Sequence, residues 1–509
     1  MNHQRHHEVP HNTFGYLISF CILAMGLGIL FVIVSTEKYG VGLSPDSVNF
    51  LSVARSLLQH DGFLNYADTP MVVWPPLYPS VLAMLGFITH LNLELAARCF
   101  NAFLFGLIVI SSGIVLYRCL DRRWAPAMAG VLAVLFSKQL ISVSVMAWTE
   151  PLFILLTLLF LHVLACSLER QSKSSLPVLC LLASLTCLTK YTGLAVLPTG
   201  ACLIMLHWDK GLKRRFLAAS SFVAFSVSPL ALWLVRNKCI SGTWFGPRSP
   251  SNCTLVESLD ITLKILASWA FPFMDVGYLP LILVAVLAIA TSLALGWSRT
   301  KRCGPPLYRH IIPYALFLMI YASLVIYTSA TIAYDSINTR LLSPIFVPLL
   351  VILLGCLSAI IYPVCRRSDR IHHGIAAAAV CLWFTVPQMA GGCDFMSSKI
   401  RNGAGGYNTV VYRESRLIEY LKSQDLKKKR IYSNAPDAML ALLGAESTFG
   451  PSKTLSKQGM RKFLSHTPCL YVWFNGIRRN YLLPPQALRK VSDVQVLFDS
   501  KEGMVYELR

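Results

Sequence analysis

Charged residues are scarce in this chain of 509 residues: Asp, Glu, Lys and Arg make up 14% of it, against 55% hydrophobic residues. So little charge is not typical of a soluble domain. Apolar runs of about 20 residues also recur along the chain, as they do in membrane-spanning proteins. Three motifs are also absent: the P-loop G-x-x-x-x-G-K-[ST], a G-x-G-x-x-G after a strand, and H-E-x-x-H. Their absence excludes the commonest nucleotide-binding and zinc-protease sites.

Acidic residues are outnumbered by Lys and Arg, 25 to 46, which gives a formal net charge of +21. The basic residues stand in short clusters between apolar runs, so we interpret them as topology signals and contacts with anionic membrane lipids, and expect no nucleic-acid partner. The 15 cysteines indicate neither a disulfide framework nor a zinc site. Most lie within apolar runs, where cysteine behaves as a small hydrophobic residue.

The apolar runs predict an α-helical polytopic membrane protein with about eleven to thirteen spans. The first run has no small-residue cleavage site after it, so we interpret it as a retained span and not a cleaved signal peptide. The predicted spans are Gly15–Val34, Cys99–Tyr117, Ala125–Val145, Leu152–Leu168, Leu176–Leu188, Thr192–Leu206, Phe216–Val235, Tyr278–Trp297, Ile311–Ser329, Leu341–Tyr362 and Ile375–Met389.

Five basic joints between these runs agree on one topology. With a cytoplasmic N-terminus, all five fall on the cytoplasmic side, as the positive-inside rule requires, provided that Pro75–His90 does not cross the membrane. That segment is shorter than the ~20 residues of a span, so we expect a surface-lying or re-entrant helix. The long polar segments, including a first outer loop at residues 36–95, then all lie on the extracytoplasmic side.

The chain divides into two predicted domains at about residue 390. Residues 1–390 form the membrane domain, and residues 391–509 form a small extracytoplasmic α/β domain. The stretch "GGCDFMSSKIRNGAGGYN", which begins at Gly391, is predicted to be a linker. After it, "PDAMLALLG" predicts a helix that ends at Gly444, "CLYVWFN" a buried strand, and "VQVLFDSKEGMVYELR" a closing hairpin.

Two acids lie where the predicted outer loops meet helices. Asp46 follows Pro45 at the start of an apolar helical pattern, and Glu150 follows Thr149 at the start of a span. Each fits an ordinary helix N-terminus, where a carboxylate is favourable. Each also fits a catalytic acid at the membrane surface, since an oriented, ionised carboxylate takes a proton from an attacking hydroxyl.

Four cations are predicted on the outer side, against the positive-inside tendency. Lys190 stands beside Tyr191 in an outer turn, and the others are Arg236, Arg248 and Arg340. Side chains of this kind either extend to lipid headgroups or bind an anionic ligand such as a phosphate. For the set of four together we favour the anionic ligand.

Several stretches, in this order, carry a resemblance to a known family. They are "SPDSVNFLSVARSLLQHDGF", "WPPLYPSVLAMLGF", "TEPLFILL", "LTKYTGLAVLP", "RNKCISGTWFGPRSPS", "TRLLSPIFVPLLVIL" and "RIYSNAPDAMLALLG". Over most of its length the chain resembles the bacterial polytopic GT-C-type glycosyltransferases, relatives of the protein O-mannosyltransferases and of the lipid A aminoarabinose transferase. The resemblance implies transfer of a sugar from a polyprenyl-phosphate carrier to an extracytoplasmic lipid, glycan or protein acceptor, in the bacterial inner membrane. We expect no cofactor and no metal, because the outer acids are scattered and not clustered as a site for a hard cation would be.

The resemblance also implies roles for individual residues. Asp46 takes the place of the catalytic base, Glu150 that of a supporting acid, and Arg340 that of a carrier-phosphate ligand. The aminoarabinose branch has a lysine before its Pro-Pro-Leu, where this chain has Trp74. This departure leaves the phosphate to Arg340, Arg236, Arg248 or Lys190. The aromatic residues Phe50, Tyr66, Trp74 and Tyr78 are expected to stack on a sugar or to anchor the loop at the interface.

Two other classes of function remain open on the sequence. A transporter is also polytopic, although we find no internal repeat of the kind that transporters show. A non-catalytic envelope-assembly subunit would keep the spans and the tail without needing the outer acids and cations.

Overall fold

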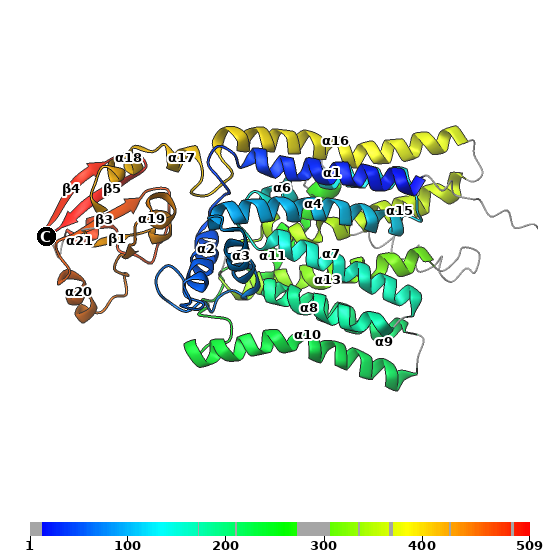
Figure 1. The fold of residues 1–509 in the computed structure, drawn as a ribbon, viewed down its shortest axis with the longest axis horizontal. Coiled ribbons are helices and arrows are strands. Elements are labelled where there is room, and N and C mark those ends of the chain that lie inside the picture. Colours follow the sequence, from blue (N-terminus) through cyan, green and yellow to red (C-terminus); the bar gives the residue numbers. More distant parts are fainter. Residues whose placement is uncertain are drawn as a thin grey trace, which may run out of the picture.

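The computed structural model describes residues 13–171, 173–208, 211–271, 306–333, 336–365, 370–426, 429–489 and 493–509. Within them, a bundle of long helices carries a small domain with a β-sheet at one end (Figure 1). The fold class predicted from the sequence, a helical membrane protein with a small C-terminal α/β domain, is confirmed. One predicted span, Tyr278–Trp297, lies outside the described residues.

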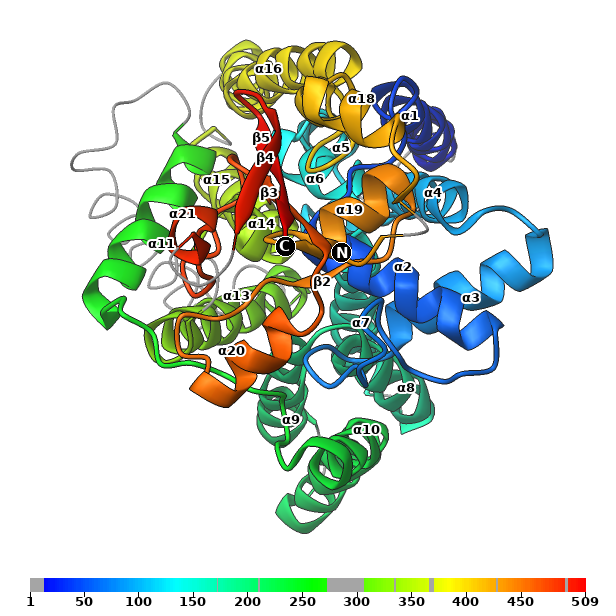
Figure 2. The same ribbon diagram turned by 90° about the vertical axis from the view of Figure 1, so that its left-hand side faces the viewer.

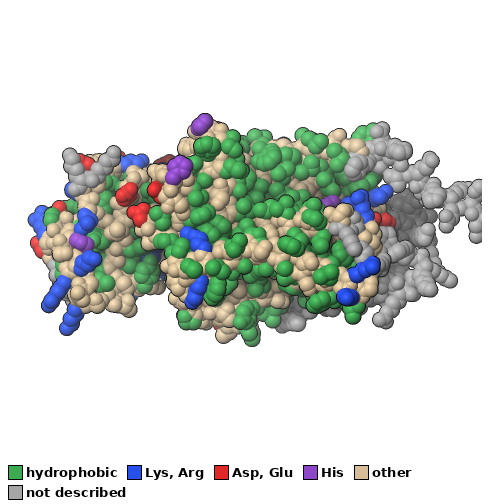
Figure 3. Space-filling model, turned by 60° about the horizontal axis from the view of Figure 1, so that its bottom comes forward, with side chains coloured by type: hydrophobic (Ala, Val, Ile, Leu, Met, Phe, Trp, Pro, Cys, Tyr) green, Lys and Arg blue, Asp and Glu red, His purple; other side chains and the backbone are tan. Residues whose placement is uncertain are grey.

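The bundle helices are built from sequence that is apolar on nearly all sides, as expected for helices surrounded by lipid and by one another. They are α1 (Thr13–Ser35), α4 (Leu93–Cys119), α5 (Trp124–Leu135), α6 (Lys138–Ser144), α7 (Glu150–Arg170), α8 (Leu176–Thr189), α9 (Val196–His207), α10 (Leu212–Ser241), α13 (Pro306–Thr331), α15 (Phe346–Cys365) and α16 (Arg370–Asn402). Hydrophobic side chains cover the flank of this bundle, and Lys and Arg lie at both of its ends and on the sheet domain (Figure 3).

Six described helices are long and apolar enough to cross a membrane, or seven if the bent pair α5 and α6 is one span. This number is lower than the eleven to thirteen spans predicted from the sequence. The predicted spans at Leu176–Leu188 and Thr192–Leu206 fall on α8 and on the helical segment Tyr191–His207, which are apolar but shorter than the six candidate spans. In Figure 1 both run alongside the longer helices.

The first loop forms two short helices, α2 (Pro45–Leu58) and α3 (Leu77–Thr89). Both run across the end of the bundle, between it and the sheet domain (Figures 1 and 2). The 13 residues of α3 extend for about 20 Å, less than the ~30 Å of the hydrocarbon core. The expectation that Pro75–His90 does not span the membrane therefore agrees with the described helix. The segment after α10 contains α11 (Leu255–Ala270). The short helix α14 (Thr339–Leu342) precedes α15.

The C-terminal domain contains a five-stranded mixed sheet in the order β2-β1-β3-β5-β4. Strand β1 pairs in parallel with β2 and β3, and β5 pairs antiparallel with β3 and β4. The predicted buried strand is β3, the closing hairpin is β4 with β5, and the predicted helix that ends at Gly444 is α19. The elements are α17 (Val410–Arg413), α18 (Arg416–Lys422), β1 (Ile431–Ser433), α19 (Pro436–Leu443), β2 (Thr448–Phe449), α20 (Lys457–Leu464), β3 (Cys469–Phe474), α21 (Pro485–Leu488), β4 (Val494–Asp499) and β5 (Gly503–Leu508).

One predicted boundary differs from the structure. Helix α16 continues through Gly391 to Asn402, so the linker predicted from Gly391 onward is wrong for its first twelve residues, 391–402. Only the segment after Asn402 leaves the helix, at Gly403 with φ of 94°. The hydrophobic core is continuous across this boundary, because buried Met439 of α19 belongs to the same cluster as buried Leu43 and Leu82 of the first loop. The C-terminal domain is therefore packed onto the first loop.

Candidate active site

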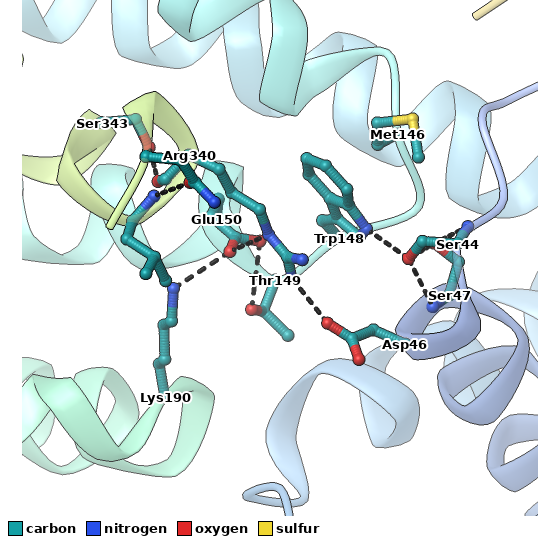
Figure 4. Close-up of polar contacts among 12 residues, drawn as sticks. Ser44, Asp46, Ser47, Met146, Trp148, Thr149, Glu150, Lys190, Arg340 and Ser343 are labelled. Carbon is teal, nitrogen blue, oxygen red and sulfur yellow. Dashed lines mark hydrogen bonds and ion pairs between the residues drawn. The ribbon is translucent and has the colours of Figure 1, made fainter. Parts of the chain in front are cut away.

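Four of the predicted site residues meet at the end of the bundle that faces the C-terminal domain. Asp46 lies in the first turn of α2, and Glu150 is the first residue of α7. Lys190 follows the last residue of α8, and Arg340 lies in α14. Each comes from the terminus of a helix or from a short helix, where the backbone leaves the bundle and its side chains can converge (Figure 4).

Arg340 joins the two acids. Its Nη2 donates to Oδ2 of Asp46 at 2.8 Å, and its Nε donates to Oε1 of Glu150 at 2.8 Å. Lys190 donates from Nζ to the same Oε1 of Glu150 at 3.0 Å. The four side chains thus form one continuous chain of ion pairs, which we name the acid–base network.

Burial differs along the network. The side chain of Glu150 is fully buried, those of Arg340 and Lys190 are 18% exposed, and that of Asp46 is 30% exposed. Two cations thus compensate the buried carboxylate of Glu150, as a charge in a medium of low polarity requires. Asp46 is the acid that an incoming molecule can reach, and two negative and two positive formal charges make the network neutral.

A tryptophan that the sequence analysis did not single out completes the site. The ring of Trp148 lies 3.8 Å from the guanidinium carbon of Arg340, and its Nε1 donates to Oγ of Ser44 at 2.7 Å. Ser44 caps α2 in a capping box with Ser47. Trp148 therefore fixes the orientation of Arg340 and the first turn of α2 at once. The sequence offered one signal for including Trp148 in the site: it stands two residues before Glu150, just before a predicted span.

The remaining predicted cations lie apart from the network and hold the backbone of the first loop. Arg236 donates from Nη1 to the carbonyl oxygen of Met71 at 2.9 Å, and its guanidinium lies 4.3 Å from the ring of Trp233. Arg248 donates to the carbonyl oxygen of Val73 at 2.9 Å. Their predicted contact with a carrier phosphate stays a prediction, since these bonds show each side chain engaged in packing the loop.

Three of the aromatic residues named from the sequence also pack within the protein. Tyr191 donates to the carbonyl oxygen of Val72 at 3.3 Å. Tyr78 is fully buried, and its hydroxyl donates to Asn101 at 3.3 Å. Trp74 is half-buried, with its ring edge-on to Phe50 at 5.7 Å. Tyr78 presents no ring face to a sugar in this structure, and Trp74 presents only part of one.

No described group of three or more His, Cys, Asp or Glu side chains is placed to hold a metal ion. In particular, Asp46 and Glu150 are separated by the guanidinium of Arg340 and do not face one another as two ligands would. The expectation of a metal-free reaction stays a prediction.

Comparison by sequence finds no family model that matches the chain and no characterised protein similar to it. Comparison of structures finds clear neighbours. ArnT from Cupriavidus metallidurans, bound to undecaprenyl phosphate, superimposes with a TM-score of 0.60 over 97% of this chain and 98% of its own, at 14% identity. The apo state of the same protein gives 0.61 at 15% identity and the same coverage.

Two further neighbours are larger proteins. The oligosaccharyltransferase of Archaeoglobus fulgidus, tethered to an acceptor peptide, gives a TM-score of 0.55 at 9% identity, over 90% of this chain and 69% of its own. The arabinofuranosyltransferase AftD from mycobacteria gives 0.51 at 13% identity, over 96% of this chain and 40% of its own. The chain therefore has the GT-C fold of these membrane glycosyltransferases over nearly its whole length.

Proposed function

We propose that this chain is a membrane glycosyltransferase that moves a sugar from a polyprenyl-phosphate carrier to an acceptor hydroxyl or amine. The observation that carries the proposal is the acid–base network at the mouth of the bundle, with Asp46 accessible and Glu150 buried behind Arg340. It stands at the junction of four segments distant in sequence, on a fold shared with ArnT over nearly the full length of both chains.

In the proposed reaction Asp46 is the general base. Its Oδ2 is bound by Arg340, while Oδ1 makes no hydrogen bond with any described residue. Oδ1 takes the proton of the acceptor, whose oxygen or nitrogen forms a bond to the anomeric carbon. The bond from that carbon to the phosphate oxygen breaks, and the phosphate leaves with the electron pair and the polyprenyl chain. Attack from the opposite face inverts the anomeric centre.

Arg340 and Lys190 are the groups that we propose to meet the leaving phosphate. Arginine matches phosphate oxygens with paired donors, and a fixed cation near the developing charge lowers the barrier. Nη1 of Arg340 makes no hydrogen bond with the described residues, so a donor remains for the phosphate. Glu150 holds both cations in place from behind, which is a supporting role.

The proposed setting is the inner membrane of a bacterium, with the network and the C-terminal domain on the extracytoplasmic side. The basic joints of the sequence support this orientation through the positive-inside rule. In Figure 3 Lys and Arg lie at both ends of the bundle, so the orientation rests on the basic joints of the sequence. A carrier of the kind bound by ArnT would lie with its chain in lipid and its phosphate at the network.

The test is sugar transfer by the purified protein in lipid vesicles, with radiolabelled polyprenyl-phosphate sugars and an extract of envelope acceptors. Asp46→Asn should lower the rate by about 100-fold or more, because it removes the proton acceptor. Asp61→Asn, which alters an exposed acid of the same loop, is the matched control and should keep full activity. A chelator should leave the rate unchanged, because the proposed reaction uses no metal.

Full activity in Asp46→Asn would remove that residue from the role of base. Absence of transfer from every donor by a folded wild-type protein would contradict the proposal and favour a transporter or an envelope-assembly subunit.

A further inference from the structure

The backbone that leads into Asp46 lies between two segments from distant parts of the chain. Gly42 donates from its amide to the carbonyl oxygen of Val145 at 2.8 Å and accepts from the amide of Ala147 at 2.9 Å. On its other side, Leu43 donates to Gly405 at 3.2 Å and accepts from the amide of Tyr407 at 2.8 Å. All three segments run parallel, so they form a miniature three-stranded arrangement, which we name the three-segment bridge.

Each segment of the bridge leads within a few residues to a functional part of the molecule. The first leads to Asp46, the second to Glu150, and the third to the C-terminal domain. Because the amides and carbonyls pair directly, a shift of the third segment moves the first. The bridge thus connects the position of the C-terminal domain with that of the proposed base.

Glycines allow the three backbones to approach so closely. A Cβ on Gly42 would lie 2.1 Å from Sδ of Met146, and one on Gly406 would lie 1.9 Å from the carbonyl oxygen of Leu43. Gly406 also has φ of 57°, a left-handed conformation that glycine adopts without strain. Gly42 and Gly406 are therefore required for the close approach of the three backbones, and do not simply make the chain flexible.

The third segment continues directly into a buried ion pair of the C-terminal domain. The hydroxyl of Tyr407 donates to Oδ2 of Asp437 at 2.6 Å, and Nη2 of Arg479 donates to Oδ1 of Asp437 at 2.7 Å. The side chain of Asp437 is fully buried and that of Arg479 is 15% exposed. Burial, together with the negative charge of Asp437, raises the pKa of Tyr407 far above its ordinary value, so the hydroxyl keeps the proton that it donates.

A further bond ties the same segment to the first loop. Nδ2 of Asn408 donates to the carbonyl oxygen of Val41 at 2.7 Å, and Arg413 donates from Nε to Oδ1 of Asn408 at 2.9 Å. Helix α19, which begins beside Asp437, packs against α2. The contact of α19 with α2 and the bond from Asn408 to Val41 thus join the first loop to the C-terminal domain close to the bridge.

We infer that Tyr407 and Asp437 are positioning residues, which act through the three-segment bridge to hold Asp46 in register with Glu150. The C-terminal domain is then a working part of the site and not a separate module. The inference rests on the proposed function for its kinetic consequence, while its structural consequence can be measured without any reaction.

The structural test is amide hydrogen exchange, followed by mass spectrometry, on the full-length protein in lipid. Tyr407→Phe removes the hydroxyl but keeps the ring. It should raise exchange at Gly42 and Leu43 about tenfold, the effect of losing one hydrogen bond to a charged group. Tyr412→Phe is the matched control: its ring lies 5.6 Å from that of Tyr407, and its hydroxyl makes no hydrogen bond with the described residues. It should leave exchange there unchanged.

Unchanged exchange at Gly42 and Leu43 in Tyr407→Phe would overturn the inference. Asp437→Asn keeps the shape of the side chain and removes its charge, and should reproduce the effect of Tyr407→Phe. If Tyr407→Phe does not fold, exchange at Gly42 and Leu43 in Asp437→Asn tests the inference instead, and unchanged exchange there would overturn it.

The kinetic test separates positioning from substrate binding. Tyr407→Phe should lower kcat about tenfold and leave KM for the donor within about twofold, because misplacing the base affects the chemical step more than binding. A rise in KM alone would contradict the inference. If the wild type transfers no sugar, the proposed function fails, and the exchange experiment still decides whether the bridge positions Asp46.

Discussion

At the scale of single residues, the site depends on how one arginine is shared between two carboxylates. Arg340 is bound on both sides and lies against the ring of Trp148, so its guanidinium has little freedom to move. A group that enters this site meets a cation whose orientation is already set. Preorganisation of this kind is the largest part of electrostatic catalysis in many enzymes.

Glu150→Gln should lower the free energy of unfolding by about 3 kcal/mol, because it leaves two cations facing a neutral buried group. Unfolding in detergent, followed by circular dichroism, measures the loss. Glu169→Gln is the control. Its pair with Arg118 is 42% and 30% exposed and 3.4 Å long, so less than about 1 kcal/mol should be lost. Equal losses of unfolding free energy in the two variants would show that the burial of Glu150 adds nothing to the stability that its ion pairs provide.

Trp148→Phe should lower both stability and activity. It removes the donor to Ser44 and weakens the face that the guanidinium of Arg340 contacts, at a cost of about 1–2 kcal/mol. Trp124→Phe, at a site that is 52% exposed on α5, should cost less than about 0.5 kcal/mol. Unfolding and transfer rates of the two variants, measured side by side, check the prediction, and equal behaviour would exclude a role for Trp148.

At the scale of elements, the short connections carry more of the site than the long helices do. The capping box of Ser44 and Ser47 fixes where α2 begins, and so places Asp46 one residue inside it. Asn338 does the same for α14, since its side chain accepts from the amide of Leu341 and places Arg340 within that single turn. The long helices determine where these short connections lie, and the caps determine which way Asp46 and Arg340 point.

Gly406→Ala should be much more destabilising than Gly444→Ala. Both glycines have positive φ, 57° and 62°, so both variants pay about 1–2 kcal/mol for the backbone conformation. Only at Gly406 would the new Cβ also meet backbone, at 1.9 Å, whereas Gly444 faces open space. Thermal unfolding of the two purified variants gives the comparison, and similar losses would contradict the close approach of the bridge.

Helix starts near Asp46 and Glu150, the helix that ends at Gly444 and the closing hairpin were all predictable from the sequence, because each has a local signal. The continuation of α16 was not. Gly391 and Gly392 suggested a joint, but a Cβ on Gly392 would lie 2.1 Å from the carbonyl oxygen of Phe136. Glycine there allows two helices to pack closely, a use that a single sequence cannot distinguish from a flexible turn.

At the scale of the whole molecule, the order of the spans and the C-terminal domain was predictable from the sequence. Which of the predicted cations meet Asp46 and Glu150 was not. Lys190 and Arg340 were proposed as members of one outer set together with Arg236 and Arg248. The first two join the acid–base network, and the last two bind the backbone of the first loop. All four share the same signal in the sequence, a cation beside or between the predicted apolar runs. Only the packing of α7, α8 and α14 around one point separates the two pairs.

Labelling with a membrane-impermeant maleimide checks the proposed orientation. In sealed vesicles with the outer face exposed, Lys501→Cys, in the exposed turn between β4 and β5, should gain label over the parent protein. Lys213→Cys, exposed at the start of α10, should gain none until detergent opens the vesicles. The reverse pattern would place the network on the cytoplasmic side.

The three-segment bridge also has a consequence for biogenesis. The bond beside the bridge, from Asn408 to Val41, joins residues 367 apart in sequence, so the first loop is translated and inserted long before the third segment of the bridge exists. Until then the segment that leads into Asp46 lacks its bonds to Gly405 and Tyr407, although a chain that stops in the membrane domain has every acid and cation of the network. On the proposed function, competence for transfer would arise only with synthesis of the last quarter of the chain.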